Sequence, residues 1–128
     1  MRETCRRLQA FEGDGCTVKQ GFATADDFRF VRAWWAIGST GTSKWFGFAK
    51  GGAYSPFYAD VYFLVNWALE GAEIQNNLNE KGGVRSNVWM HKDTAPNFFF
   101  RPCITWPRRT NGLSFRVILN SSVTPFQG

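Results

Sequence analysis

The sequence is poor in the side chains on which metal binding and nucleophilic catalysis depend. It holds one histidine, His91, and three cysteines, Cys5, Cys16 and Cys103, with no Cys-x-x-Cys pair among them. A structural zinc site takes four closely spaced Cys or His ligands, and a catalytic triad needs a histidine beside a nucleophile and an acid. We therefore expect no metal site and no catalytic residues, with His91 on the surface and Cys103 as an inert buried thiol.

Phosphate-binding loops and long apolar runs are also missing. Neither Gly-x-x-x-x-Gly-Lys-Ser/Thr nor Gly-x-Gly-x-x-Gly occurs, and the nearest sequence, Lys50-Gly51-Gly52, suits either a phosphate or a tight turn. No stretch approaches the roughly 20 apolar residues of a membrane helix, and Met1 is not followed by the apolar segment of a signal peptide. With free cysteines, this pattern predicts a soluble protein of the reducing cytoplasm without membrane contact.

Aromatic residues are abundant instead. The 128 residues include 13 Phe, six Trp and three Tyr, which is enough apolar surface to close the core of one domain. Aromatic rings pack well on the pleated faces of a sheet. We therefore expect residues 1–128 to form a single α+β domain, mainly antiparallel β-sheet with one or two short helices.

Positive charge is concentrated toward the C-terminus. The formal net charge is +5, and six of the 15 Lys and Arg residues lie within residues 84–128, where Asp93 is the one acidic residue. The remaining nine basic residues are balanced by nine acidic residues in residues 1–83. This asymmetry fits a surface that binds a polyanion, and it equally fits charge that serves solubility.

The hydrophobic pattern predicts two helices and five strands. Strands are assigned where apolar residues alternate, and helices where they recur every three or four residues. The predicted helices span residues 1–12 and 69–81, and the predicted strands span residues 27–37, 44–50, 60–67, 98–106 and 113–119. The second and third strands should be neighbours in a sheet, and the last two should form a hairpin around the Asn-Gly turn at residues 110–112.

Single residues within these elements are assigned as well. Phe28 and Phe30 should share one strand face, and the preceding Asp26-Asp27 pair should cap or turn the chain. In the second helix Ile74 and Leu78 should share a face, and Gly82-Gly83 should end it. Residues 120–125 should form a fraying tail, and three residues of the hairpin should lie in the core: Phe98, Phe100 and Ile104.

Four blocks of the sequence, in this order, carry a resemblance to a known family. The blocks are "VKQGFATADDFRFVRAWW" (18–35), "KWFGFAKGGAYSPFYADVYFLVNW" (44–67), "GAEIQNN" (71–77) and "FFFRPCITWPRRTNGLSFRV" (98–117). They resemble the segment that follows the catalytic domain in adenine-specific DNA methyltransferases of the phage-exclusion and fused restriction-modification kind. The most specific elements are Lys-Gly-Gly-x-Tyr, Asp-x-x-x-x-Val-Asn-Trp and Thr-Trp-Pro-x-Arg.

The resemblance implies a truncated target-recognition segment. It covers about residues 18–117, whereas residues 118–128 diverge, and the family commonly has glycine where this chain has Ala25 and Cys103. The Asn-Pro-Pro-Tyr motif that grips a flipped adenine and the glycine-rich motif that binds S-adenosylmethionine are both absent. We therefore expect no methyl transfer by this chain and no cofactor.

Two functions remain open. The first is a DNA-binding module that contacts double-stranded DNA, with or without a separate methyltransferase subunit, through phosphate contacts and one aromatic contact to bases. The candidate contact residues are Lys50, Arg101, Trp106, Arg108, Arg109 and Arg116. The second is an orphan gene fragment, carried on a mobile element, that has become a small self-associating homodimer without DNA binding; Arg108 and Arg109 then merely solvate the end of a hairpin. Small-ligand binding in an aromatic pocket also stays open.

Overall fold

The computed structural model describes most of the chain from residue 18 onward. The described residues are 18–38, 43–50, 57–58, 60–91, 95–107, 114–119 and 122–123. The predicted helix over residues 1–12 and the predicted turn at residues 110–112 lie outside this set.

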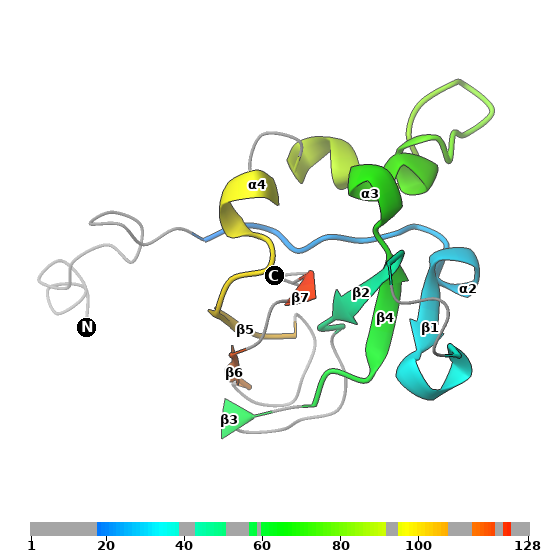
Figure 1. The fold of residues 1–128 in the computed structure, drawn as a ribbon. Coiled ribbons are helices and arrows are strands. Elements are labelled where there is room, and N and C mark those ends of the chain that lie inside the picture. The colour runs from blue at the N-terminus through cyan, green and yellow to red at the C-terminus, as the bar shows by residue number, and fades with distance from the viewer. Residues whose placement is uncertain are drawn as a thin grey trace, which may run out of the picture.

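Two small sheets form the β-part of the fold (Figure 1). The first has the order β1 (Val31–Ala33), β4 (Phe63–Asn66), β2 (Trp45–Phe48) and β7 (Ser122–Val123), and the second has the order β3 (Phe57–Tyr58), β6 (Arg116–Ile118) and β5 (Cys103–Thr105). Most pairs are antiparallel, and β2–β7 and β3–β6 are parallel. The helical segments are α2 (Asp27–Phe30), η1 (Trp34–Ala36), α3 (Ala68–Gln75), η3 (Val88–His91) and α4 (Ala95–Phe98). The predicted α+β class is confirmed.

The β2–β4 pair forms the centre of the larger sheet. Phe46 lies opposite Val65, which in turn lies opposite Val31 of β1. Side chains alternate between the two faces of a strand, so these residues and Phe48 share the inner face, and Val31, Phe48 and Val65 are buried. The predicted pairing of residues 44–50 with residues 60–67 is confirmed.

The core of the protein is a cluster of aromatic rings around Phe22. The side chain of Phe22 is fully buried, and its ring centroid lies 5.3 Å from Trp67, 6.0 Å from Phe48 and 6.4 Å from Phe99. Such ring pairs contribute about 0.5–1.5 kcal/mol each beyond the burial of their surface. Phe22 belongs to an extended segment that runs past the larger sheet to α2 (Figure 1).

Asn87 holds this extended segment in place. Its side-chain amide donates to the carbonyl oxygen of Gly21 and accepts from the backbone N–H of Ala23, both at 2.7 Å. Its own backbone N–H donates to the carbonyl oxygen of Ala23 at 3.4 Å. The backbone groups of this segment on either side of Phe22 are thus hydrogen-bonded although the segment is not a strand of either sheet.

The prediction of a strand over residues 27–37 is wrong for its first part. Asp26 accepts a hydrogen bond from the backbone N–H of Arg29 and caps the short helix α2, and only Val31–Ala33 is strand. Residues two apart in a helix lie on opposite sides of it, so Phe30 is buried whereas Phe28 is 91% exposed. The predicted capping role of the Asp26-Asp27 pair is confirmed.

The second predicted helix is shorter than expected. α3 ends at Gln75, and Leu78 lies beyond it in a bridge to Val84, half exposed. The side chain of Asn79 accepts hydrogen bonds from the backbone N–H groups of Lys81 and Gly83. These bonds favour a turn over continued helix, so Ile74 and Leu78 do not share a helix face.

The predicted hairpin is confirmed in its pairing and wrong in its extent. β5 and β6 are antiparallel, but β5 begins only at Cys103, because the chain forms α4 up to Phe98 and Phe100 has a φ of 62°. Phe100 packs against the core as expected, whereas Phe99 is the buried ring and Ile104 is 49% exposed. Residues Ser122–Val123 form β7 beside β2 instead of a fraying tail.

Ala25 occupies a backbone conformation that suits glycine. Its φ is 61°, in the left-handed region that costs a residue with a Cβ atom about 1–2 kcal/mol. Replacing Ala25 by Gly removes this cost and adds about 0.5–1 kcal/mol of chain entropy loss. We expect Ala25→Gly to raise the free energy of unfolding by about 0.5–1 kcal/mol in urea titrations.

Ala23→Gly is the matched control for this prediction. Ala23 is also exposed but is not among the residues with positive φ, so the same substitution should lower the stability there. Equal effects at Ala23 and Ala25 would contradict the assignment of strain to Ala25.

Candidate nucleic-acid interface

The predicted contact residues lie in two regions of the structure. Lys50 follows β2 of the larger sheet, whereas Arg101, Trp106 and Arg116 lie on or beside β5 and β6 of the smaller sheet. Arg108 and Arg109 lie outside the described residues. The candidate residues that the structure describes are therefore divided between the two sheets.

The residues of the smaller sheet differ in their exposure. Arg101, before β5, is exposed, and Trp106, after β5, is half-buried with its ring centroid 5.5 Å from that of Phe115. Arg116 is opposite Thr105 in the β5–β6 register, and both side chains are buried, with Arg116 only 6% exposed. Arg116 can contact a phosphate only if the residues that bury its side chain move, whereas the side chain of Arg101 is already exposed to solvent.

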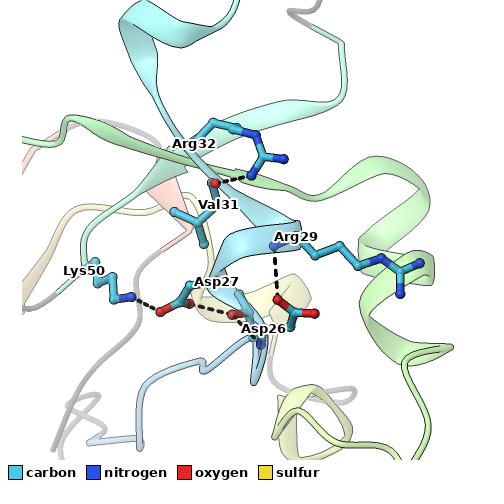
Figure 2. A network of polar contacts seen from close by, with 7 residues as sticks. Asp26, Asp27, Arg29, Val31, Arg32 and Lys50 are labelled. Carbon is cyan, nitrogen blue, oxygen red and sulfur yellow. Dashed lines mark hydrogen bonds and ion pairs between the residues drawn. The ribbon is translucent and has the colours of Figure 1, made fainter.

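Lys50 is held in a network of polar contacts around the start of α2 (Figure 2). Its ammonium group forms an ion pair with the carboxylate of Asp27. The other carboxylate oxygen of Asp27 accepts a hydrogen bond of 2.6 Å from the hydroxyl of Thr24, which itself accepts from the backbone N–H of Asp26 at 3.3 Å. The backbone N–H of Lys50 donates to the carbonyl oxygen of Phe48 at 2.8 Å. Both ends of the lysine are thus restrained.

These contacts shift the pKa of Asp27. Partial burial acts to raise the pKa of this carboxyl group, but hydrogen bonds from Lys50 and Thr24 and the charge of Lys50 together lower the pKa below its ordinary value. The contacts thus stabilise the ionised carboxylate, which pairs with Lys50.

A second group of cations and rings was not identified from the sequence. The guanidinium of Arg32 lies 5.9 Å from the ring centroid of Trp45, and the ammonium of Lys44 lies 5.7 Å from it. Arg32 also donates to the carbonyl oxygens of Val31, at 2.7 Å, and Phe28. The alternation of arginines with aromatic residues over residues 29–35 was the available signal for this group.

This group lies on the outer face of the larger sheet. Arg32 pairs in register with Leu64, and Leu64 with Gly47, so Arg32 and Trp45 share the face opposite to the buried Val65. The outer face therefore carries both charge and an aromatic ring. Lys44 is also 3.6 Å from Glu73, in an exposed ion pair of low stability.

Neither a metal centre nor a membrane segment is found in the described part of the chain. Within residues 18–123, excluding the gaps, no three His, Cys, Asp or Glu side chains are grouped to hold a metal ion. Across the same residues no helix combines the length and apolar composition needed to cross a bilayer. The side chain of His91 is outside the described set, and its surface position stays a prediction.

Comparison with known proteins relates the chain to a methyltransferase. In an alignment of 110 residues that covers 76% of the chain, it is 29% identical to the adenine-specific methyltransferase PglX of Lacticaseibacillus casei (strain Zhang). The match spans 9% of the length of that protein. No protein-family model matches the chain. The chain is thus similar to one small region of an adenine-specific methyltransferase.

Removing the ammonium group of Lys50 should raise the pKa of Asp27. In Lys50→Met the burial of Asp27 persists, but one hydrogen bond and the neighbouring charge that lower the pKa are gone. A lowered carboxyl pKa stabilises the fold above the unfolded-state pKa, and this contribution is lost as the pH falls through the folded-state pKa. The variant should therefore show a higher Asp27 pKa in a carboxyl NMR titration and a weaker loss of stability as the pH falls below about 4.

Lys44→Met is the matched control, because Lys44 pairs with Glu73 and not with Asp27. It should leave the titration of Asp27 unchanged. If Asp27 titrates at the same pH in Lys50→Met as in the wild type, the ion pair does not form in solution.

Proposed function

We propose that this chain is a non-catalytic DNA-binding module that corresponds to a target-recognition region of an adenine-specific methyltransferase. The observation that carries the proposal is the similarity to PglX over 76% of the chain. The excess of positive charge in residues 84–128 supports it, because Lys and Arg side chains provide the main attraction to a DNA backbone.

The phosphate contacts are proposed to come from both sheets. Arg101 precedes β5 and Trp106 follows it, and a strand of three residues is only about 10 Å long. Arg108 and Arg109 come next in the sequence, and together with Arg101 they are proposed to contact phosphates of one duplex, since DNA carries a charge every 1.7 Å or so along its axis. Lys50 adds a contact from the larger sheet, Trp106 approaches the bases, and Arg116 takes part where β6 becomes accessible.

Methyl transfer is proposed to depend on residues outside this sequence. The chain has no Asn-Pro-Pro-Tyr sequence and no glycine-rich cofactor motif, and the region of similarity is 9% of a much longer methyltransferase. A separate methyltransferase subunit is therefore the protein partner that fits this role, and the chain would supply binding without chemistry.

The salt dependence of binding tests the DNA-binding proposal. The logarithm of the association constant falls with the logarithm of the salt concentration by about 0.9 for each phosphate that is neutralised. We expect duplex binding to weaken steeply with salt, and Arg108→Ala combined with Arg109→Ala to reduce this slope by about 1.8. Fluorescence anisotropy with a labelled duplex at several salt concentrations measures both.

Lys19→Ala combined with Lys81→Ala controls for the loss of two charges. Both lysines are exposed and lie away from β5 in the sequence, so this pair should change the slope little. Duplex binding that is indifferent to salt and to both pairs of substitutions would overturn the proposal.

Self-association is the second candidate function, and exposed rings favour it. Phe28 and Phe57 are 91% and 82% exposed, and Trp34 and Trp35 directly follow β1, an edge strand of the larger sheet. An edge strand offers free backbone groups to a further strand, and a second copy would cover both the edge and the rings. A symmetric homodimer is the commonest result of such a contact.

Sedimentation equilibrium tests this second candidate. A wild-type chain at 100 micromolar or so should have twice the mass of one chain, and Trp34→Lys combined with Trp35→Lys should return it to one chain mass because lysine charges oppose burial. Trp89→Lys is the control, since Trp89 is similarly exposed but belongs to η3. A monomeric wild-type protein at this concentration would contradict self-association.

A further inference from the structure

Lys50 differs from Arg101 because its side chain is partly buried and already forms an ion pair. Its ammonium group is paired with the carboxylate of Asp27, which lies 23 residues earlier in the chain. A phosphate that approaches this ammonium group also meets the negative charge of Asp27, so a close contact favours release of the lysine from the carboxylate. The pair therefore bears directly on whether Lys50 contributes to binding.

The geometry allows the exchange. The side chains of Lys50 and Asp27 are 29% and 51% exposed, so a phosphate can approach the ammonium group from solvent. Asp27 would keep a hydrogen-bond donor after the exchange, because the hydroxyl of Thr24 lies 2.6 Å from its other oxygen. Figure 2 shows Lys50 reaching Asp27 from outside α2, on the side opposite to Arg29. Withdrawal of the lysine therefore leaves α2 and its cap intact.

We infer that Asp27 is a positioning residue that restrains Lys50 in the free protein, and that a backbone phosphate of duplex DNA displaces it. This inference rests on the proposed DNA-binding function. It assigns Asp27 an inhibitory part: the carboxylate occupies the place that the phosphate takes in the complex.

The exchange has a signature in the affinity for DNA and not in its salt dependence. When a lysine neutralises a phosphate, one DNA counterion is released and the slope grows by about 0.9. This release is the same when Lys50 comes from Asp27, because counterions condense on the closely spaced charges of DNA and not on an isolated carboxylate. Lys50 should thus add about 0.9 to the slope in the wild type and in Asp27→Asn alike, whereas the broken ion pair should weaken binding by the wild type alone.

Asp27→Asn and Asp26→Asn form a matched pair of variants. Each removes one negative charge at neighbouring positions, asparagine at position 26 retains the helix cap, and asparagine at position 27 retains an oxygen that can accept from Thr24. We expect Asp27→Asn to bind duplex DNA about two- to fivefold more tightly than Asp26→Asn at low salt, as the strength of exposed ion pairs predicts. Adding Lys50→Ala to Asp27→Asn should abolish this gain.

The outcomes separate this inference from the DNA-binding proposal. If the wild type binds duplex DNA in a salt-dependent way but Asp27→Asn and Asp26→Asn have equal affinities, the inference fails and the proposed function stands. A gain that persists after Lys50→Ala overturns the inference as well, because it would be a general charge effect. A wild type that does not bind duplex DNA overturns both. Asp27→Ser removes the same carboxylate and gives a second measurement if the asparagine variant is unfolded in circular dichroism.

Discussion

The burial of Phe22 is the interaction on which the rest of the structure depends. Its ring contacts Phe48 of β2, Trp67 before α3 and Phe99 after α4, so one side chain joins three parts of the chain that are distant in sequence. Asn87 binds the backbone on either side of Phe22 and fixes its approach. The position of Phe22 in turn fixes where the following residues enter α2, and hence where Asp27 meets Lys50.

The elements that the sequence predicts well are those with a dense run of apolar residues. β2 and β4 are such runs, and they pair as the sequence predicts. The extended segment around Phe22 has no such run, and its hydrogen-bond partner Asn87 lies 65 positions later in the chain. In residues 27–30 a pattern is present, but the structure does not follow it. The alternation of Phe28 and Phe30 suggests a strand, whereas the hydrogen bond that Asp26 accepts as helix cap makes a helical turn more favourable.

The candidate interface was predictable in its residue types and not in its arrangement. The charge excess of residues 84–128 points to Arg101, and the Thr-Trp-Pro-x-Arg element points to Trp106, both without a structure. The burial of Arg116 depends on the register that places it opposite Thr105, which no local pattern encodes. The pairing of Lys50 with Asp27 depends likewise on tertiary structure. Contacts of this kind determine which cations are available to a ligand, so a charge count overestimates the interface.

The two positions where the resemblance places glycine show how the backbone constrains substitution. At Ala25 a φ of 61° retains the conformation that glycine adopts freely, so alanine there keeps the turn at a cost in free energy. Cys103 begins β5, where extended backbone accepts any residue with a Cβ atom, and its half-buried thiol lies opposite Ile118. Loss of glycine therefore strains the turn that leads to Asp27 and leaves β5 unstrained. Asp27 restrains Lys50, so strain at Ala25 affects the position of the candidate cation of the larger sheet. It does not affect Arg101, which lies beside β5 in the smaller sheet.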